Sequence, residues 1–188
     1  MVGLFGGSFD PIHHGHLLVA QAAMEALALE ELRFVPARQQ PFKAGNHGAD
    51  AADRVRMVEL AIAGEPQFQV ERFEVERPGP SFTVETLRAL RAREPSTDFV
   101  LLVGADAAAE LPTWHEAGEI ARLAQVVMFA RPAEQALGPA GDYESIRVPQ
   151  VEISASAIRR RVRAGQSIQF WVPEAVRDHI AAHRLYLD

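Results

Sequence analysis

The sequence predicts an α/β fold in which an open, mainly parallel sheet carries helices on both faces. Short apolar runs without a charged residue recur at residues 2–5, 99–103 and 126–130. Such runs are typical of strands that are covered on both sides. The chain also begins with a strand–helix–strand pattern, and a helical crossover joins strands that run parallel. The two observations together favour a layered α/β architecture.

Composition limits the class of protein and its partners. The 188 residues are 48% hydrophobic and fit one globular domain spanning residues 1–188. No apolar run is long enough to cross a membrane and no signal peptide is visible, so we expect a cytoplasmic protein without a membrane partner. The net charge of −6 argues against nucleic acid as a partner, because that needs an extended basic face. The absence of cysteine excludes disulfides and thiolate chemistry.

The first strand, at residues 2–5, ends in a turn that carries Gly6 and Gly7, and a helix begins near Gly15. Glycines let backbone N–H groups come close to a ligand, and a helix N-terminus presents unpaired N–H groups and a positive dipole end to the same place. The expected ligand is a phosphate. His13 and His16, three residues apart across the helix start, are expected to lie on one face and to add side-chain donors.

Two other interpretations of these histidines are open at this point. A single histidine is most often a structural or surface residue. Imidazole is also a common zinc ligand. Because the chain has no cysteine and no carboxylate-rich ligand set accompanies His13 and His16, we expect no metal bound directly to protein side chains.

The stretch at residues 6–16, GGSFDPIHHGH, resembles the (His/Thr)-Xaa-Gly-His signature of the nucleotidyltransferase superfamily. Its wording is most similar to the bacterial nicotinate-mononucleotide adenylyltransferases. The resemblance implies a Rossmann-like fold of the nucleotidyltransferase type. The two standard nucleotide motifs, Gly-Xaa-Gly-Xaa-Xaa-Gly and Gly-Xaa4-Gly-Lys-Ser/Thr, are absent, so the nucleotide must be bound by other means. Candidate ATP-binding residues in this stretch are Gly6, Gly7, Ser8 and Phe9.

A second strand is expected at residues 32–35, followed by a long loop at residues 36–50. This loop lies at the carboxyl end of a strand, where open α/β sheets bind ligands. A lone loop lysine is most often solvated, but the family places a basic residue of this loop near the phosphates, which implies that role for Lys43. The family's Asn and His positions are Ala37 and Phe42 in this chain, so no role is carried over to them.

The middle of the chain predicts a helix at residues 54–63 and strand segments at residues 68–70 and 73–75, with a turn at residues 77–80. Another helix opens at residues 81–87, with Ser81 as its expected N-cap. The hydroxyl residues here could be caps and nothing else. The family's Pro-Ser-Tyr-Thr segment faces the nicotinate ring, which makes Thr83 a candidate mononucleotide contact.

The most apolar run, at residues 99–103, predicts a central strand, and Gly104 and Asp106 follow at the sheet's carboxyl edge. In the family a Gly-Xaa-Asp there lines the nucleotide site. Trp114 sits in a polar loop before a helix at residues 116–123, so it is either a buried packing residue or a ring that stacks on a flat ligand. The resemblance implies the second role for Trp114 and His115. Arg131, which follows the strand at residues 126–130, is a further candidate on the mononucleotide side.

Residues 132–144 are expected to form a surface loop and residues 146–148 the last strand. Residues 153–161 then start a helix with Ser154 as N-cap and Gly165 as its stop. This segment resembles the superfamily's second signature, Ile-Ser-Ser-Thr-Xaa-Ile-Arg-Xaa-Arg, with Ala155 and Ser156 at the central positions.

The second signature implies phosphate binding by Ser154, Ser156 and the helix N-terminus. Several arginines follow, and an arginine cluster on a helix is normally a solvated face. Only an arginine that points back to the helix N-terminus can reach a phosphate there, which favours Arg159 over Arg160, Arg161 and Arg163. The final segment, residues 172–187, is expected to be a packing helix without chemistry.

The resemblance implies an enzyme that transfers AMP from ATP to nicotinate mononucleotide, giving deamido-NAD and pyrophosphate. A phosphate monoester with a second pKa of about 6 is largely dianionic at neutral pH, so the nucleophile needs no general base. The implied catalytic residues are His16 at the α-phosphoryl group, His13 at the neighbouring phosphates and Arg159 at the β- and γ-phosphates. Mg²⁺ is expected as cofactor, bound mainly through ATP oxygens and water.

Other functions on the same scaffold stay open. Nicotinamide mononucleotide is a possible alternative substrate, since backbone contacts decide that choice. Pantetheine-phosphate adenylyltransferases usually carry Thr at the position of His13, and glycerol-phosphate cytidylyltransferases lack the loop with Lys43. A non-catalytic nucleotide sensor is the alternative from another class, and it would bind ATP without turnover. The oligomeric state is not predictable from the sequence.

Overall fold

The computed structural model describes residues 1–38, 48–130, 143–149 and 151–187. These residues contain one six-stranded sheet in the order β3-β2-β1-β4-β5-β6, and every neighbouring pair is parallel. The predicted α/β fold with a mainly parallel, Rossmann-like sheet is therefore confirmed. The strands are β1 (Val2–Gly7), β2 (Glu31–Pro36), β3 (Phe68–Val70), β4 (Phe99–Gly104), β5 (Gln125–Ala130) and β6 (Glu144–Arg147).

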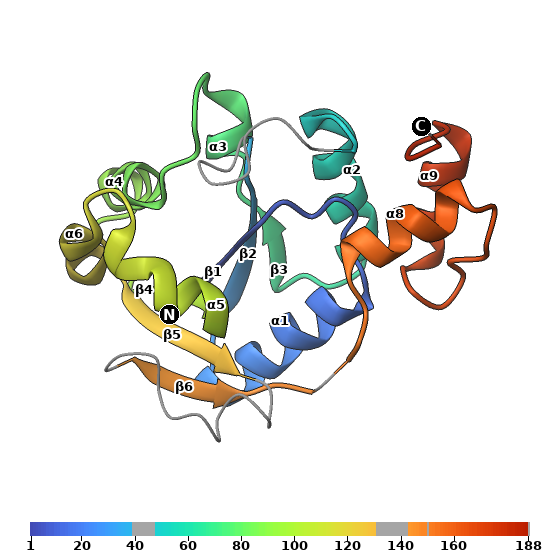
Figure 1. Cartoon of the computed structure of the whole chain (residues 1–188). Helices are drawn as coiled ribbons and strands as arrows, with labels where there is room; N and C mark the ends of the chain where they lie inside the picture. The colour runs from blue at the N-terminus through green and yellow to red at the C-terminus, as the bar shows by residue number, and fades with distance from the viewer. Residues whose placement is uncertain (39–47, 131–142, 150, 188) are drawn as a thin grey trace.

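Helices cover both faces of the sheet (Figure 1). One face carries α1 (His14–Leu27), α2 (Ala51–Ile62), α8 (Ala155–Arg163) and α9 (Glu174–Ala182). The other face carries α4 (Thr83–Arg93), α5 (Ala105–Glu110) and α6 (Ala117–Leu123). Two shorter pieces, α3 (Phe73–Glu76) and the 3-10 turn η1 (Leu111–Thr113), complete the described helical segments. In the described part of the chain, no helix is long and apolar enough to cross a membrane.

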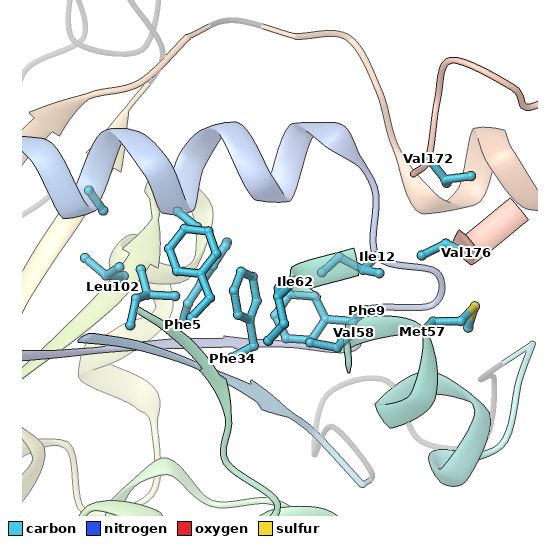
Figure 2. Packing of buried hydrophobic residues seen from close by; sticks show 14 of the residues in the cluster. Phe5, Phe9, Ile12, Phe34, Met57, Val58, Ile62, Leu102, Val172 and Val176 are labelled. Atoms are coloured by element: carbon cyan, nitrogen blue, oxygen red, sulfur yellow. The ribbon is translucent and has the colours of Figure 1, made fainter. Parts of the chain in front are cut away.

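Each face has its own hydrophobic core, because successive side chains of a strand point to opposite sides. Phe5 packs on the α1 side while its neighbour Leu4 packs on the α4 side, and Leu102 and Leu101 divide in the same way. Figure 2 shows Phe5, Phe34 and Leu102 close together on the α1 side. Burial of a side chain of this size stabilises the fold by roughly 1.5–3 kcal/mol. This two-sided burial explains why the strands are apolar runs and not alternating patterns.

Three expected helix boundaries agree with the structure. The helix expected near Gly15 begins at His14, and α2 covers the helix predicted for residues 54–63 up to Ile62, with Ala63 as its C-cap residue. The Ser154 hydroxyl accepts a hydrogen bond from the Ala157 N–H at 3.2 Å, so Ser154 is the N-cap of α8. Gly165 follows α8 with a φ of +64°, a conformation that costs glycine little.

Two local predictions were wrong. Residues 73–75 form the short helix α3 and not a strand, because the Glu71 carboxylate accepts the Phe73 N–H at 3.0 Å and turns the chain. Phe82, not Ser81, is the N-cap residue of α4. The Ser81 hydroxyl instead accepts the Arg38 N–H at 3.0 Å and ties the start of α4 to the loop after β2. The first contact spans two residues and the second spans 43, and the hydrophobic pattern of the segment predicts neither.

The sheet order determines where a ligand can bind. The chain moves outward from β1 to β2 and β3, and then returns to the other side of β1 with β4. Where the order reverses, the connections after β1 and β4 leave in opposite directions and open a crevice at the carboxyl ends of the strands. The glycine turn after β1 and Gly104 at the end of β4 both lie at this point.

Candidate active site

A crevice with two lobes lies at the carboxyl ends of β1 and β4. The larger lobe has a volume of about 690 Å³ and the smaller one about 440 Å³. Gly6, Gly104 and Asp106 line both lobes, so the two volumes adjoin along the ends of the central strands. The smaller lobe adds His13, His16 and Ser154, and the larger lobe adds Thr83, Trp114 and His115.

The glycines at the end of β1 shape the floor of the crevice. A Cβ atom added at Gly6 would meet no atom within 4 Å, so this backbone faces open space from which a ligand can approach. A Cβ atom at Gly7 would instead lie 2.9 Å from the Phe9 ring. Phe9 itself is buried and has a φ of +47°, which turns its ring back beneath the crevice. Its ring meets the His16 ring edge-on at 5.1 Å between centroids.

His13 and His16 form a stacked pair at the start of α1. Their ring centroids lie 3.7 Å apart with an interplanar angle of 21°, so the expectation that they share one face is confirmed. The backbone N–H of His13 donates to Nδ1 of His16 at 3.3 Å, which orients the His16 ring. Nδ1 of His13 is buried and has no hydrogen-bond partner among the described residues. The pair therefore keeps side-chain hydrogen-bonding capacity available next to the smaller lobe.

Burial keeps both rings neutral. Burial, reinforced by the nearby His14, lowers the pKa of His13 from 6.5 to about 4. Burial, reinforced by His13, also lowers the pKa of His16 well below its usual value. At neutral pH each imidazole thus has one N–H donor and one acceptor nitrogen, and neither carries a charge.

The N-terminus of α8 closes the smaller lobe from the opposite side. Ser154 and Ala155 line the lobe, and the hydroxyls of Ser154 and Ser156 lie 3.2 Å apart. A Cβ atom at Gly15 would lie 3.7 Å from the Ile153 carbonyl oxygen, so the starts of α1 and α8 approach each other closely. Two helix N-termini therefore face one cavity, an arrangement that favours anions.

Arg159 lies against Asp10 beside the crevice. Its Nη1 donates to the Asp10 carbonyl oxygen at 2.7 Å and lies 3.7 Å from the Asp10 carboxylate. The Arg159 side chain is 24% exposed and lines neither lobe. Arg160 and Arg163 are exposed, and Arg161 stacks over the Trp171 ring at 4.9 Å. Arg159 is thus the arginine of this cluster that turns towards the turn after β1.

Asp10 connects the crevice to the end of the chain. Its carboxylate accepts the N–H groups of Gly48 at 2.7 Å and Ala49 at 3.1 Å, and the Tyr186 hydroxyl at 2.8 Å. Burial, together with the Asp10 charge, raises the pKa of Tyr186, so its hydroxyl stays a donor. The final segment, expected to serve packing alone, therefore supplies a hydrogen bond to the residue that holds Arg159.

Sequence analysis also missed Arg54. Its guanidinium is buried and donates to the Ser8 carbonyl at 2.8 Å, the Ala37 carbonyl at 2.7 Å and the Arg38 carbonyl at 3.3 Å. It thereby joins the loops that follow β1 and β2. Its position in the sequence could have indicated this role. Arg54 lies on the same buried helix face as Val58 and Ile62, and a buried charge needs hydrogen-bonding partners.

The larger lobe is built from rings. Trp114 is half-buried against the α4 core, and its indole Nε1 is buried without a hydrogen-bond partner among the described residues. His115 is exposed and its ring lies 4.7 Å from the Phe82 ring, tilted by 41°. Thr83 begins α4 on the same wall. Both interpretations of Trp114 are therefore compatible with its position, because the ring packs on the core and also faces the lobe.

A buried carboxyl group, Glu74 on α3, also lines the larger lobe. The Thr86 hydroxyl donates to it at 2.9 Å. Burial raises the pKa of Glu74, and the hydrogen bond from Thr86 opposes that shift. The carboxyl group is therefore less readily ionised than an exposed one, which reduces its repulsion of an anionic ligand in this lobe.

The remaining predicted site residues fall into two groups. Ser8 and Phe9 lie beneath the crevice, where Ser8 offers its carbonyl to Arg54 and Phe9 packs on His16. Lys43 and Arg131 lie outside the described residues, as does most of the loop predicted for residues 132–144. Their predicted roles stay predictions.

Potential metal-ligand side chains are grouped outside the crevice in the described part of the chain. Among the described residues, the grouping of three potential ligand side chains is Asp53 with His179 and His183, on α2 and α9. None of these residues lines the two lobes. The described residues that line the crevice thus do not include this grouping.

Comparison with known proteins provides independent evidence. The family model described as cytidylyltransferase-like matches residues 4–161. A protein of Geobacillus kaustophilus named "Probable nicotinate-nucleotide adenylyltransferase" is 44% identical over 185 residues, which cover 98% of this chain and 85% of that protein. A Thermus thermophilus protein of the same name is 45% identical over 188 residues, covering 98% of each chain.

Solved structures share the fold at lower sequence identity. The Plasmodium falciparum nicotinic acid mononucleotide adenylyltransferase complexed with NaAD superposes with a TM-score of 0.80 at 20% identity and covers 98% of this chain and 96% of that one. The same enzyme complexed with APC gives a TM-score of 0.76. At this identity the likeness demonstrates the α/β architecture and its sheet order.

Proposed function

This chain belongs to the cytidylyltransferase-like family, and from that premise we propose that it is a nicotinate-nucleotide adenylyltransferase of NAD biosynthesis. It transfers AMP from ATP to nicotinate mononucleotide and releases pyrophosphate. The full-length similarity to relatives of that name supports the assignment. The chemistry of the site supports it as well.

The observation that carries the proposal is the two-lobed crevice. The lobe beside His13, His16 and the α8 N-terminus offers donors and positive helix ends, which suits phosphates. The adjoining lobe offers aromatic rings, which suit a flat heterocycle. A reaction between two nucleotides needs both surfaces, with the reacting phosphates meeting where the lobes join at Gly6, Gly104 and Asp106.

The reaction balances without a side-chain base. A phosphate oxygen of the mononucleotide attacks the α-phosphorus of ATP, the P–O bond to the β-phosphate breaks, and pyrophosphate leaves with the electron pair. A phosphate monoester has a second pKa of about 6, so this oxygen is already ionised at neutral pH. What the protein must supply is alignment of two mutually repelling anions and stabilisation of the developing charge.

We assign this stabilisation to the residues around the smaller lobe. His16 contacts the α-phosphoryl and bridging oxygens, and His13 contacts the neighbouring phosphates. Both act as neutral donors, since burial lowers the pKa of each ring. The α8 N-terminus with Ser154 and Ser156 binds phosphate oxygens. Arg159 is assigned to the β- and γ-phosphates, and the predicted phosphate contact of Lys43 is kept as part of the proposal.

Arg159 has donors to spare for this role. Its guanidinium donates one N–H to the Asp10 carbonyl oxygen. Arginine has five N–H donors, so it can keep this contact and still meet a phosphate. Asp10 and Tyr186 then act as positioning residues that hold Arg159 at the edge of the crevice.

Mg²⁺ is the proposed cofactor, held mainly by ATP oxygens and water. The described part of the crevice has no cluster of carboxylates and imidazoles that would hold the ion alone. When bound, the ion neutralises charge on the leaving pyrophosphate. This division suits Mg²⁺, which gives up its water ligands reluctantly.

The larger lobe is proposed to bind the pyridine ring, with Trp114 stacking on it and His115 and Thr83 beside it. The Nε1 donor of Trp114 lacks a partner among the described residues, so a ligand oxygen that reached it would satisfy a buried group. A site that offers donors to the nicotinate carboxylate would leave the NH₂ of nicotinamide unpaired. That costs about 1–3 kcal/mol, or roughly 5- to 150-fold in discrimination.

The test is an assay of pyrophosphate release with ATP, Mg²⁺ and either nicotinate or nicotinamide mononucleotide. We expect turnover with the nicotinate compound and a kcat/KM at least about fivefold lower with the nicotinamide compound. Equal use of both would overturn the proposed specificity. ATP binding without pyrophosphate release would overturn the proposed activity in favour of a nucleotide sensor.

A further inference from the structure

A group of potential metal-ligand side chains lies where α9 packs on α2, away from the crevice (Figure 1). Asp53 lies in the first turn of α2, His179 lies in the last turn of α9, and His183 is the C-cap residue of α9. One ligand atom from each residue lies within 4.8 Å of the other two. The fold therefore brings together two imidazoles and a carboxylate although Asp53 and His179 are 126 residues apart in the sequence.

The separation between Asp53 and His179 fits two ligands of one ion. Nε2 of His179 and Oδ1 of Asp53 lie 2.9 Å apart. Zinc binds imidazole nitrogen and carboxylate oxygen at about 2.0–2.2 Å, so two ligands of a tetrahedral ion are about 3.4 Å apart. The two atoms would therefore have to separate by about half an ångström to share one ion, a shift that side-chain rotation can supply.

His183 contributes the third ligand from the same helix face. It follows His179 by four residues, and their ring centroids lie 4.0 Å apart. Two histidines at this spacing on a helix can bind one zinc ion. Nδ1 of His183 lies 3.1 Å from the His179 carbonyl oxygen. If Nδ1–H donates there, Nε2 keeps a free lone pair, and this second contact is the usual way in which a ligand histidine is oriented.

The three side chains together are exposed enough for a bound ion to contact solvent. The side chain of His179 is 9% exposed and that of Asp53 is 23% exposed, while His183 is exposed. Three protein ligands and one water complete a four-coordinate zinc ion. A plain ion pair between Asp53 and His179 explains two of the three positions but gives no role to His183.

We propose that Asp53, His179 and His183 bind a divalent ion of the zinc class and that this ion ties α9 to α2. Two imidazoles favour zinc or a similar transition metal over Mg²⁺ and Ca²⁺, which prefer oxygen ligands. The bound ion holds the segment that leads to Tyr186, whose hydroxyl donates to Asp10 beside the crevice. The site is structural and is independent of the adenylyl-transfer assignment.

The test is titration of metal-stripped protein with ZnCl₂ by calorimetry, on protein from which any histidine tag has been removed. We expect one strong site in the wild type. His183→Ala and Asp53→Asn should each weaken zinc binding by at least about tenfold. His183 is exposed, so its replacement should leave the fold intact, which circular dichroism would verify.

Two control variants separate this site from others. Asp178→Asn removes an exposed carboxylate next to His179 that pairs with Arg177, and it should leave zinc affinity unchanged. His16→Ala removes a histidine of the crevice and should also retain the strong site. Zinc should raise the Tm of the wild type and of both controls, but not that of His183→Ala.

Three outcomes would overturn the proposal. Wild-type protein with no zinc affinity at about 100 μM would do so, since this weak limit lies far above any structural site. Unchanged affinity in both His183→Ala and Asp53→Asn would show that the ion binds elsewhere. Loss of the strong site in His16→Ala would assign the zinc to the crevice histidines.

Discussion

Two pairs of neighbouring histidine rings occupy opposite kinds of helix end in this protein. His13 and His16 lie at the start of α1 with ring centroids 3.7 Å apart, and His179 and His183 lie at the end of α9 with centroids 4.0 Å apart. The first pair adjoins two helix N-termini, which favour anions. The second pair adjoins the Asp53 carboxylate and the carbonyl end of its helix, which favour cations.

The comparison shows that the surroundings decide what a histidine pair can bind. The first pair is neutral because burial lowers the pKa of both rings, so it can donate to phosphates without carrying a fixed charge. The second pair is oriented by a carboxylate and a carbonyl oxygen, which is the environment of a metal ligand. The sequence spacing of the two pairs, three and four residues, does not distinguish these roles.

The largest effect is expected when one ring is removed from each pair and adenylyl transfer is measured. His16→Ala should lower turnover by roughly 10²–10³, the loss seen when one donor to a developing oxyanion is removed. His183→Ala, on the far helix, should retain near-normal turnover. Steady-state pyrophosphate release measures both. Near-normal turnover in a folded His16→Ala protein would remove the first pair from catalysis.

The positive charge beside the first pair can be tested through two arginines of α8. Arg159→Ala should raise the KM for ATP and lower turnover by roughly tenfold to a hundredfold, because it removes a charged hydrogen bond worth about 1.5–3 kcal/mol. Arg163→Ala is the matched control, since that side chain is exposed and should matter little. Equal and small effects in the two variants would show that the α8 arginines form only a solvated face.

The pH dependence of stability tests the burial of the first pair. The pKa of His13 is about 4 in the folded protein and 6.5 when unfolded, so the unfolded chain takes up a proton that the folded chain refuses. His13 alone should therefore lower the stability by about 2 kcal/mol as the pH drops from about 7 to about 5, and His16 adds to this loss. Urea unfolding at the two pH values measures this loss.

The control for that experiment is a pair of single variants. His13→Gln should lose most of the slope that His13 contributes, whereas His183→Ala should keep it. If His13→Gln unfolds with the same pH dependence as the wild type, burial of His13 is not the cause. His16, whose pKa burial also lowers, accounts for a residual slope in the same direction.

The smallest of these effects is expected in the larger lobe, where a substitution tests whether the lobe binds the mononucleotide alone. Trp114→Ala removes a proposed stacking partner of the pyridine ring, which is worth about 0.5–1.5 kcal/mol. The KM for the mononucleotide should rise by roughly 2- to 12-fold, while the KM for ATP should change little. A rise in the KM for ATP of the same size would show that Trp114 supports the whole crevice and not one substrate.

Sequence patterns identified the parts of this fold that depend on near neighbours in the chain. The strands at the sheet centre are apolar because helices cover both faces, and the Ser154 cap depends on an N–H three residues away. The arrangement around His13 and His16 could be predicted for the same reason, because the glycine turn, the helix start and the two rings follow one another in the chain.

The parts that sequence patterns missed depend on distant partners. Arg54 acts on a carbonyl 46 residues away, and Tyr186 donates to a carboxylate 176 residues away. Residues 73–75 alternate like a strand, yet their middle residue, Glu74, is the buried one because Thr86 of α4 donates to it. The metal-ligand group on α2 and α9 was invisible for the same reason, because Asp53 and His179 are 126 residues apart.

In the proposed mechanism, the first histidine pair binds phosphates while the mononucleotide itself attacks ATP. The most direct test uses ATP made chiral at the α-phosphorus by a single sulfur atom and determines the configuration of the dinucleotide product by phosphorus NMR. One direct displacement predicts inversion at the α-phosphorus. Retention would mean two displacements, with a histidine of the crevice carrying AMP in between, and would contradict the assignment of His13 and His16 as donors only.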